Sequence, residues 1–422
     1  MVSCSCKEKH GIETVAEEEA EVRKMEQKKG LLSGVTVLDL TRVLAGPYCC
    51  MMLADMGADV IKIEMPGRGD DARRNAPLVN GESAYYINLN RNKRGMTLNL
   101  KTEEGKGIFR ELVKKADIVV ENYRPGVMDR LGLGYSELKK INPALIYGAV
   151  SGFGQYGPYS QRAGYDIVGQ AMSGLMSVTG WPGGQPTRTG TAISDVLGGM
   201  SVCIGILAAY ANRLKTGEGE MVDVSLVDST VSALEIINMI YLCTGRIPQP
   251  TGNKYEAIAP YDTFQAKDGL VVIAAGNDKL YNILKTIIRD DRLDAEEFDG
   301  NVKRVTNYEH LKPIIEDWTR DKTIDEVVEL CLAQGVPASP VNTLDRVVKD
   351  PHIAVAREMF IETEHPIAGR IKITGNQLKF TEHPVSLRKT APLLGEDTET
   401  ILKDELGYTH EQYEAYKEKG AF

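Results

Sequence analysis

The sequence lacks the short signatures of several large enzyme classes. It contains no HExxH, no two paired CxxC motifs, no GxSxG and no GxxxxGK[ST]. Histidine is scarce and absent between positions 32 and 309, the six residues standing at 10, 310, 352, 365, 383 and 410. Strand ends within that stretch therefore cannot supply the histidine of a Ser–His or Cys–His pair. These absences argue against a metal hydrolase, and we expect no metal site.

Membrane, secreted and nucleic-acid-binding proteins are also disfavoured. No apolar run approaches the length of a membrane span, and the start MVSCSCKEKHGIE lacks the apolar core of a secretory signal. Seven cysteines, at 4, 6, 49, 50, 203, 243 and 331, are odd in number and irregularly spaced, which favours reduced thiols in the cytoplasm. Cys4 and Cys6 could form a metal or redox pair, but no second pair completes a zinc set. The net charge of −9 disfavours nucleic acid, and an anionic ligand would need locally clustered positive charge.

The stretch from 35 to 64, VTVLDLTRVLAGPYCCMMLADMGADVIKIE, is the clearest local pattern. It predicts a strand, a helix that begins at Gly46 and Pro47, a left-handed helix end at Gly57, and a second strand. Such a βαβ unit needs a parallel sheet around it. Because its turn has no GxGxxG, it predicts a ligand site that is not for a nicotinamide dinucleotide.

The rest of the chain divides into segments of different character. At 422 residues, with 42% apolar and 26% charged residues, the chain is globular in composition and long enough for two domains. Residues 1–30 are charged, without an apolar stripe, and we interpret them as an N-terminal extension. Strand and helix patterns then alternate, with strands expected at 35–40, 60–64, 96–100, 116–122, 144–154 and 221–228. This alternation predicts an α/β fold with a doubly wound parallel sheet and ligands at the carboxyl ends of its strands.

A second, smaller unit follows the alternating region. A turn-rich linker begins near 245, and the unit contains a strand within 269–277 and a capping box from Thr323 to Glu326. GVPASPV, at 335–341, resembles a second linker. Segments rich in β-forming residues and a terminal helix complete the chain.

Two aspartates stand beside glycines at expected helix starts. Asp195 lies in GTAISDVLGGM, where Gly198 and Gly199 would let a bulky substrate approach. A carboxylate there faces unpaired backbone N–H groups and the positive helix end, which would keep it ionised and in position. Asp166, in GYDIVGQAMSGLM, has a similar setting. For both, helix capping is the alternative that the sequence leaves open.

Basic side chains cluster after the predicted strands. They could hold phosphates, although each alone also fits a solvated surface charge. They are Arg91, Lys93, Arg94, Arg124, Arg130 and Arg162.

The motifs together carry a family resemblance. LxGxxVLDLTRVLAGP, GADVIKIE, NRNKRG, ADIVVENYRPG, QRAGYD, GTAISDVLGGM, TGEGEMVDVSL and APLLGEDT follow one another in this order. They resemble the class III coenzyme A transferases of the formyl-CoA:oxalate and succinyl-CoA:dicarboxylate type, from about residue 31 to the end. The resemblance implies a large Rossmann-like domain that binds coenzyme A, built from 31–225 and from 341–422, a stretch that holds a second linker and the return to the large domain. It further implies a smaller α+β domain with its linker at 226–340, and an interlocked homodimer.

The resemblance also implies a reaction and its residues. The aspartate of GxxxxDxxxGM, here Asp195, is the family's nucleophile. It would transfer coenzyme A from an acyl-CoA such as succinyl-CoA, acetyl-CoA or formyl-CoA to a carboxylic acid. The intermediates would be an aspartyl mixed anhydride and an aspartyl-CoA thioester, with no tightly bound cofactor. Implied coenzyme A contacts are Leu44, Ala45, Leu98, Asn99, Leu100, Lys101, Asn122, Tyr123, Arg124, Arg130 and Arg162, and residues implied near the active site are Tyr165, Asp166, Gly198 and Gly199.

Two departures from the family pattern bear on the ligands. The arginine that often follows the IE strand is Met65 here, and Arg68 is the candidate replacement. The glycine-rich loop of the oxalate-specific branch is replaced by NKYEA at 253–257, which leaves the acceptor acid open.

Two other functions compete with acyl transfer. A 2-methylacyl-CoA racemase of the same fold uses a GHD step, whereas the step here is Gly164, Tyr165 and Asp166. Tyr165 is a poor base because an unperturbed phenol titrates near 10. A non-enzymatic coenzyme A-binding or assembly protein would not depend on Asp195.

Overall fold

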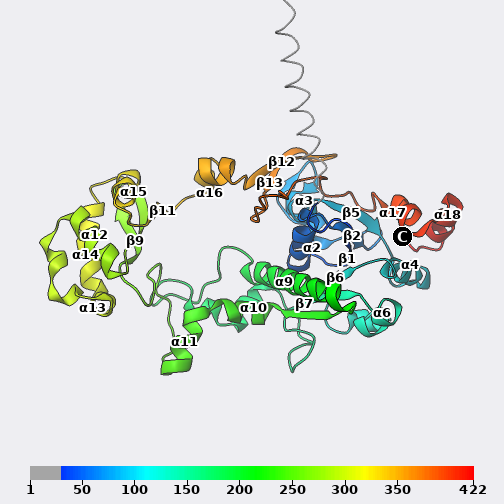
Figure 1. Ribbon diagram of the computed structural model, residues 1–422, viewed down its shortest axis with the longest axis horizontal. Coiled ribbons are helices and arrows are strands. Elements are labelled where there is room, and N and C mark those ends of the chain that lie inside the picture. Colours follow the sequence, from blue (N-terminus) through cyan, green and yellow to red (C-terminus); the bar gives the residue numbers. More distant parts are fainter. Residues whose placement is uncertain (1–29) are drawn as a thin grey trace, which may run out of the picture. The chain divides into compact units, whose positions relative to one another are not determined.

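The computed structural model describes residues 30–422, which form two compact units (Figure 1). The large unit holds 30–173, 191–233 and 357–422, and the small unit holds 174–190 and 234–356. Both ends of the described chain therefore contribute to the large unit, as the family resemblance implied. The expected N-terminal extension, with Cys4 and Cys6, lies outside the described residues except for Gly30.

A six-stranded parallel sheet forms the centre of the large unit. Its strands are β1 (Thr36–Asp39), β2 (Asp59–Glu64), β5 (Lys93–Thr97), β6 (Ile118–Glu121), β7 (Ile146–Ser151) and β8 (Met221–Ser225). Their spatial order is β5-β2-β1-β6-β7-β8, and every neighbouring pair is parallel. This is the strand order of a Rossmann-type doubly wound fold, which confirms the predicted fold class. The order reverses between β1 and β6, and at such a point the carboxyl ends of the strands leave a crevice.

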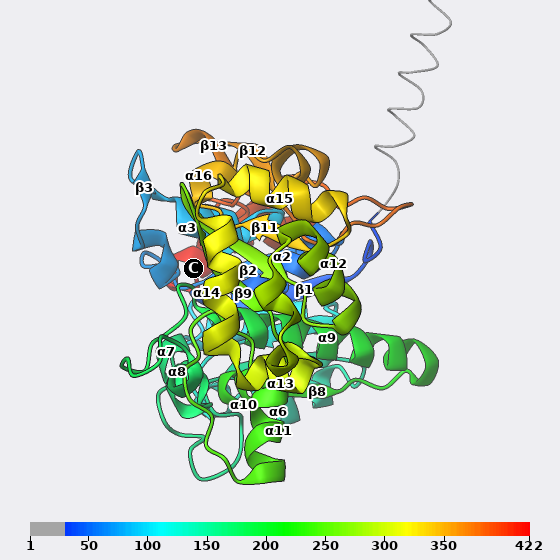
Figure 2. The same cartoon turned by 90° about the vertical axis from the view of Figure 1, so that its left-hand side faces the viewer.

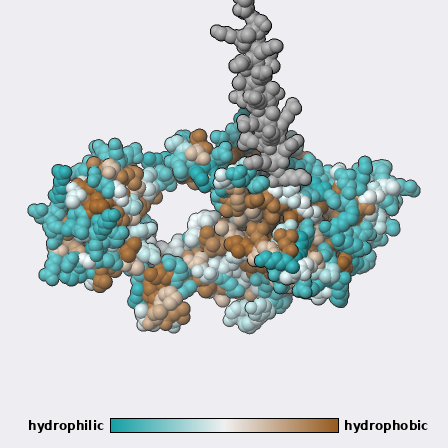
Figure 3. Space-filling view, in the orientation of Figure 1, coloured by the Kyte–Doolittle hydropathy of each residue, from teal (hydrophilic) through white to brown (hydrophobic). Residues whose placement is uncertain are grey.

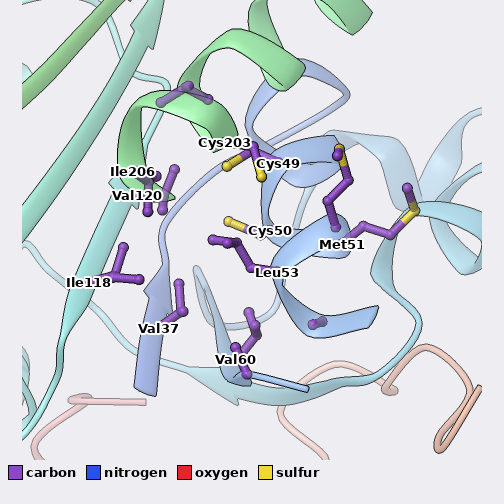
Figure 4. Close-up of a cluster of buried hydrophobic side chains, with 14 of the residues drawn as sticks. Val37, Cys49, Cys50, Met51, Leu53, Val60, Ile118, Val120, Cys203 and Ile206 are labelled. Atoms are coloured by element: carbon purple, nitrogen blue, oxygen red, sulfur yellow. The ribbon is translucent and has the colours of Figure 1, made fainter. Parts of the chain in front are cut away.

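Apolar side chains cover both faces of this sheet. Alternate residues of a strand point to opposite faces, so Ile118 and Val120 of β6 join one buried cluster while Val119 joins another. The first cluster contains residues of α2 (Ala45–Asp55) and α9 (Ile193–Thr216), including Cys49 and Cys203. Figure 4 shows the sulfur atoms of these two cysteines close together. The second cluster is completed by α4 (Glu103–Val113), α6 (Tyr135–Ile141) and α17 (Thr398–Leu406).

The remaining elements of the large unit are short. They are η1 (Asp71–Arg74), β3 (Leu78–Val79), β4 (Glu82–Ser83), α3 (Ala84–Asn90), α5 (Val127–Arg130), α7 (Asp166–Met172), α10 (Leu226–Ala233), β12 (Phe360–His365), β13 (Gly369–Thr374) and α18 (His410–Glu418).

Helix α9 packs closely against the sheet. Side chains on Gly148 of β7 and Gly205 of α9 would collide with Ile206 and Val222, respectively, so glycine permits the close approach. The opposite side of α9 exposes Ile204 and Leu214. By length and composition α9 is the one helix among the described residues that could cross a membrane. Helices α10 and α11 (Glu235–Thr244), which meet at a bend, pass the same test only when the two are counted together as one span. The sequence analysis missed α9 in this respect. Packing on the sheet accounts for only part of its apolar composition, since 39% of the apolar window is buried.

The small unit is built on a three-stranded antiparallel sheet. Strands β9 (Tyr261–Ala266), β10 (Gly269–Ala274) and β11 (Ala338–Pro340) lie in the order β11-β10-β9. Figure 2 shows α12 (Asp278–Ile288), α13 (Asn301–Thr306), α14 (Tyr308–Thr319) and α15 (Ile324–Ala333) around these strands. The predicted capping box at Thr323 and Glu326 begins α15. Outside this core the unit has α8 (Leu175–Val178), α11, η2 (Asp291–Asp294), η3 (Glu296–Phe298), α16 (Leu344–Val347) and the π-helix η4 (Pro351–Ala356).

Several predicted boundaries were wrong. The strand expected at 96–100 is β5 at Lys93–Thr97, so the NRNKRG segment enters the sheet earlier than its turn-like composition suggested. The expected linker at 335–341 contains β11, which pairs with β10. Residues 174–190 belong to the small unit, which was not predicted. The chain rejoins the large unit at 357, within the stretch 341–422 that was expected to hold the second linker and the return.

Candidate active site

A cavity of about 620 Å³ lies in the large unit at the carboxyl ends of the strands. Loops that follow β1, β2, β5, β6 and β7 all contribute to its wall. It therefore occupies the reversal point of the sheet, where doubly wound folds bind ligands, and its volume suits a medium-sized organic ligand.

Most residues implied by the family resemblance line this cavity. Those that do are Leu44, Ala45, Leu98, Asn99, Leu100, Lys101, Asn122, Tyr123, Arg124, Arg162, Tyr165 and Asp195, and Met65 and Arg68 also lie there. Arg130 is exposed at the end of α5 and does not line the cavity, so its contact with coenzyme A stays a prediction. Asp166, Gly198 and Gly199 lie behind the wall.

Four acidic residues line the cavity, and Asp195 differs from the other three, Glu64, Asp70 and Asp71, because each of those is ion-paired. Asp195 stands in the first turn of α9 and is largely buried. Within residues 30–422, its carboxylate has no hydrogen-bond donor and no ion-pair partner. Burial, and then the negative charge of Asp166, raise its pKa to about 7. The sequence analysis expected the helix start to keep this group ionised. The structure instead gives a carboxyl group whose pKa lies near neutral pH, so that it is partly protonated there.

Asp166 takes the capping role that the sequence left open for Asp195. Its Oδ1 accepts a hydrogen bond from the backbone N–H of Ser194 at 2.9 Å, and its Oδ2 accepts one from Gln170 Nε2 at 2.7 Å. A carboxylate on α7 thus satisfies an N–H group at the start of α9, a helix without a side-chain cap of its own. Asp166 thereby fixes the backbone beside Asp195 and raises the pKa of that carboxyl.

The two glycines after Asp195 serve helix packing. A Cβ on Gly199 would stand 2.5 Å from the backbone oxygen of Ala45, and one on Gly198 would stand 2.6 Å from Leu226 Cδ2. They bring α9 against the first turn of α2 and against α10. The expectation that they open space for a substrate was therefore wrong.

The basic residues divide into two groups. Three are paired inside the large unit: Arg91 with Asp55 at 2.6 Å, Lys93 with Asp39 at 2.9 Å, and Arg94 with Asp59. These three are not free to hold phosphates, which corrects the sequence interpretation. The cations that line the cavity are Arg42, Arg68, Lys101, Arg124 and Arg162.

Polar contacts brace the cavity wall. The side chain of Asn122 donates to the backbone oxygen of Arg42 and accepts from its N–H, both at 2.7 Å, which ties the loops after β1 and β6 together. Arg42 also lies over the ring of Tyr123, 5.0 Å from its centroid. Arg68 pairs with Asp71 at 3.0 Å at the rim. The side-chain amide of Asn122 therefore braces the wall.

Tyr85 is a site residue that the sequence analysis missed. It lies on α3, and burial together with the charges of Asp195 and Asp70 raises the pKa of its hydroxyl well above the ordinary value of 10.0. The group stays protonated at neutral pH and is near enough to Asp195 for their charges to interact, although Tyr85 is not among the residues that line the cavity. The ESAYYIN segment gave no signal for this proximity. In the part of the chain that the structure describes, no three His, Cys, Asp or Glu side chains converge to hold a metal ion.

Comparisons with known proteins agree with this geometry. The model of CoA-transferase family III matches residues 32–398. Succinyl-CoA:glutarate CoA-transferase of Homo sapiens is 38% identical over 379 residues, which cover 89% of this chain and 86% of that protein. Succinyl-CoA:mesaconate CoA-transferase of Haloarcula marismortui is 42% identical over 389 residues, covering 90% and 97%. The crystal structure of a CAIB/BAIF family protein from Brucella suis is 37% identical, with a TM-score of 0.79 over 89% of this chain and all of that one.

Proposed function

Because the chain belongs to CoA-transferase family III and is a CoA-transferase, we propose that it moves coenzyme A from an acyl-CoA to a dicarboxylic acid with Asp195 as nucleophile. The observation that carries this proposal is a largely buried carboxylate, unpartnered among the described residues, on the wall of a ligand-sized cavity. Relatives named for glutarate and mesaconate support a dicarboxylic acceptor and succinyl-CoA as the donor.

In the first half of the reaction, Asp195 takes up the acyl group of the donor and then exchanges it for coenzyme A. An Asp195 oxygen attacks the thioester carbonyl, the C–S bond breaks, and coenzyme A leaves as a thiolate, giving a mixed anhydride. The thiolate then attacks the aspartyl carbonyl and releases the donor acid, which leaves an aspartyl-CoA thioester. Because the thioester energy is retained, no ATP is consumed.

The second half repeats these steps with the acceptor. A carboxylate oxygen of the acceptor attacks the aspartyl thioester and releases the thiolate, giving a second anhydride. The thiolate attacks the acceptor's acyl carbonyl, and Asp195 leaves as a carboxylate. The protonated Tyr85 hydroxyl is our candidate donor to the oxyanions.

The cavity cations are assigned to the anionic groups of coenzyme A. Arg42, Arg68, Lys101 and Arg124 follow four different strands and bring positive charge to one edge of the sheet. Arg162 approaches from the loop that leads to Tyr165. This clustering supplies the local positive charge that a chain of net charge −9 needs to bind a polyanion. We expect coenzyme A to be exchanged as a substrate and no tightly bound cofactor to be present.

Trapping the intermediate tests the proposal. Wild-type protein incubated with succinyl-CoA and then hydroxylamine should carry a hydroxamate on the peptide containing Asp195, detectable by mass spectrometry. Asp195→Asn should carry none, and Asp404→Asn, an exposed aspartate on α17, is the matched control that should label like the wild type. Full transfer activity in Asp195→Asn would refute the assignment. Exchange of solvent deuterium at C2 of a 2-methylacyl-CoA without transfer would instead indicate a racemase.

We also propose a cytoplasmic homodimer. Helix α11 has no buried residue, although it carries Met239, Tyr241 and Leu242, each more than half exposed. Figure 3 shows hydrophobic surface in the region of α11. An apolar helix left uncovered within one chain is typical of a subunit interface. Size-exclusion chromatography with light scattering should give twice the chain mass, and Leu242→Glu should shift it toward the monomer.

A further inference from the structure

A buried ion pair stands beneath the turn between β1 and α2. Lys62 on β2 and Asp70 are both fully buried, with Lys62 Nζ 3.0 Å from Asp70 Oδ2. Lys62 also donates to the backbone oxygen of Thr41. The carboxylates of Asp39 and Asp70 together raise the pKa of Lys62 against its burial, and the charge of Lys62 lowers the pKa of Asp70. Both stay ionised near neutral pH and are unsuited to proton transfer. A buried pair is also weak evidence for stability, because desolvation offsets the attraction.

The pair holds a strained residue. Asp70 Oδ1 accepts hydrogen bonds from the backbone N–H of Val43 at 3.1 Å and of Ala72 at 2.9 Å. Val43 has a φ of +68°, in the left-handed region that a β-branched residue avoids. Such a conformation is strained and persists only where its surroundings enforce it. The carboxylate of Asp70, itself fixed by Lys62, makes the contact that enforces it here.

The strained turn is mechanically connected to Asp195. Leu44 and Ala45, directly after Val43, line the cavity together with Asp195. The backbone oxygen of Ala45 lies so close to Gly199 that a Cβ there would stand 2.5 Å away. Gly199 is one helical turn after Asp195 on α9. A displaced turn would therefore move both the cavity wall and the helix that carries the nucleophile.

We propose that Lys62 and Asp70 are positioning residues that clamp Val43 in its left-handed conformation and thereby set Leu44, Ala45 and Asp195 in register for acyl transfer. The inference rests on the proposed function of Asp195 and deepens it. It assigns both residues to the geometry of the site: Lys62 lies behind the cavity wall, and Asp70, which lines the cavity, acts through its hydrogen bond to Val43.

The test is a rescue experiment. Asp70→Asn removes the charge that holds Lys62, and kcat should fall at least tenfold while KM for succinyl-CoA changes less than about threefold. Adding Val43→Gly should restore at least a third of the wild-type kcat, since glycine adopts positive φ without strain. Adding Arg289→Gly instead is the matched control, because Arg289 also has positive φ, at +57°, but lies in the small unit. That second change should restore nothing.

Each outcome decides the matter. An unchanged kcat in Asp70→Asn, no rescue by Val43→Gly, or equal rescue by Arg289→Gly would overturn the proposal. If Asp70→Asn does not fold, the same comparison uses Asp70→Glu, which keeps the charge but moves the carboxylate away from Val43. Hydroxylamine labelling of the wild type distinguishes failure of the proposed function from failure of the clamp. No label at Asp195 refutes the proposed function. Normal labelling of the wild type, together with an unchanged kcat in the Asp70 variant, refutes only the clamp.

Discussion

Replacing the Asp195 carboxyl with a neutral amide is expected to stabilise the protein at neutral pH while abolishing transfer. Burial raises the pKa of Asp195 from 3.8 to about 7, so the folded protein binds this proton more tightly than the unfolded chain does. The wild type therefore loses stability as pH rises from about 4 to about 7, and the loss is complete above that range. Asp195→Asn has no such proton to release, so its stability lacks this component.

The expected size follows from the two pKa values. Since each pKa step is worth about 1.4 kcal/mol, the free energy of unfolding of Asp195→Asn relative to wild type should grow by roughly 2–3 kcal/mol between pH 5 and pH 8. Other titrating groups are common to both proteins and cancel in the difference. A difference that stays flat with pH would refute the argument that desolvation of this carboxyl limits stability.

The measurement must report on the large unit. Trp181 and Trp318 are the only tryptophans, and both lie in the small unit, so tryptophan fluorescence is unsuitable. Urea denaturation followed by far-ultraviolet circular dichroism, with amide exchange of the α9 peptide, samples the right region. Asp404→Asn, exposed on α17, is the control for losing one surface carboxylate and should give no comparable pH-dependent gain.

Three further predictions test neighbouring contacts. Asp166→Asn should lower the pKa of Asp195, so the pH of half-maximal labelling by succinyl-CoA and hydroxylamine should fall; an unchanged profile would contradict the charge effect. Gly199→Ala should cost about 1–3 kcal/mol in urea denaturation, because its Cβ would strike the Ala45 oxygen, and an unaltered midpoint would show that α2 can move aside. Iodoacetamide followed by peptide mapping should modify exposed Cys243 before buried Cys49, whose thiol pKa is raised by burial and by Cys203; equal rates would place Cys49 near solvent.

Much of the large unit could be predicted because its signals are local. The strand patterns at 60–64, 116–122 and 144–154 correspond to β2, β6 and β7. Residues 174–190 belong to the small unit although they lie between two segments of the large unit, and this could not be predicted. Membership in a unit depends on contacts between distant segments, and no local pattern encodes them.

The presence of Asp195 in the cavity wall was predictable, but its supporting residues were not. Asp195 carries a motif, whereas Asp166 acts through a hydrogen bond to Ser194 that depends on how α7 meets α9. Lys62 appeared only as a polar residue within a strand, and its pairing with Asp70 depends on the loop after β2 folding back beneath the turn. Tyr85 likewise depends on the position of α3.

The basic residues show how one misplaced strand changed an interpretation of function. With β5 expected at 96–100, Lys93 and Arg94 were assigned to a ligand loop, but the strand begins at Lys93 and both side chains pair with carboxylates of the large unit. The cations that do reach the cavity all follow the carboxyl end of a strand: Arg42 after β1, Arg68 after β2, Lys101 after β5, Arg124 after β6 and Arg162 after β7. In a doubly wound sheet, a basic residue within a strand needs a buried partner, whereas one just beyond its carboxyl end faces the ligand crevice. The exact strand end therefore decides whether such a residue belongs to the framework or to the site.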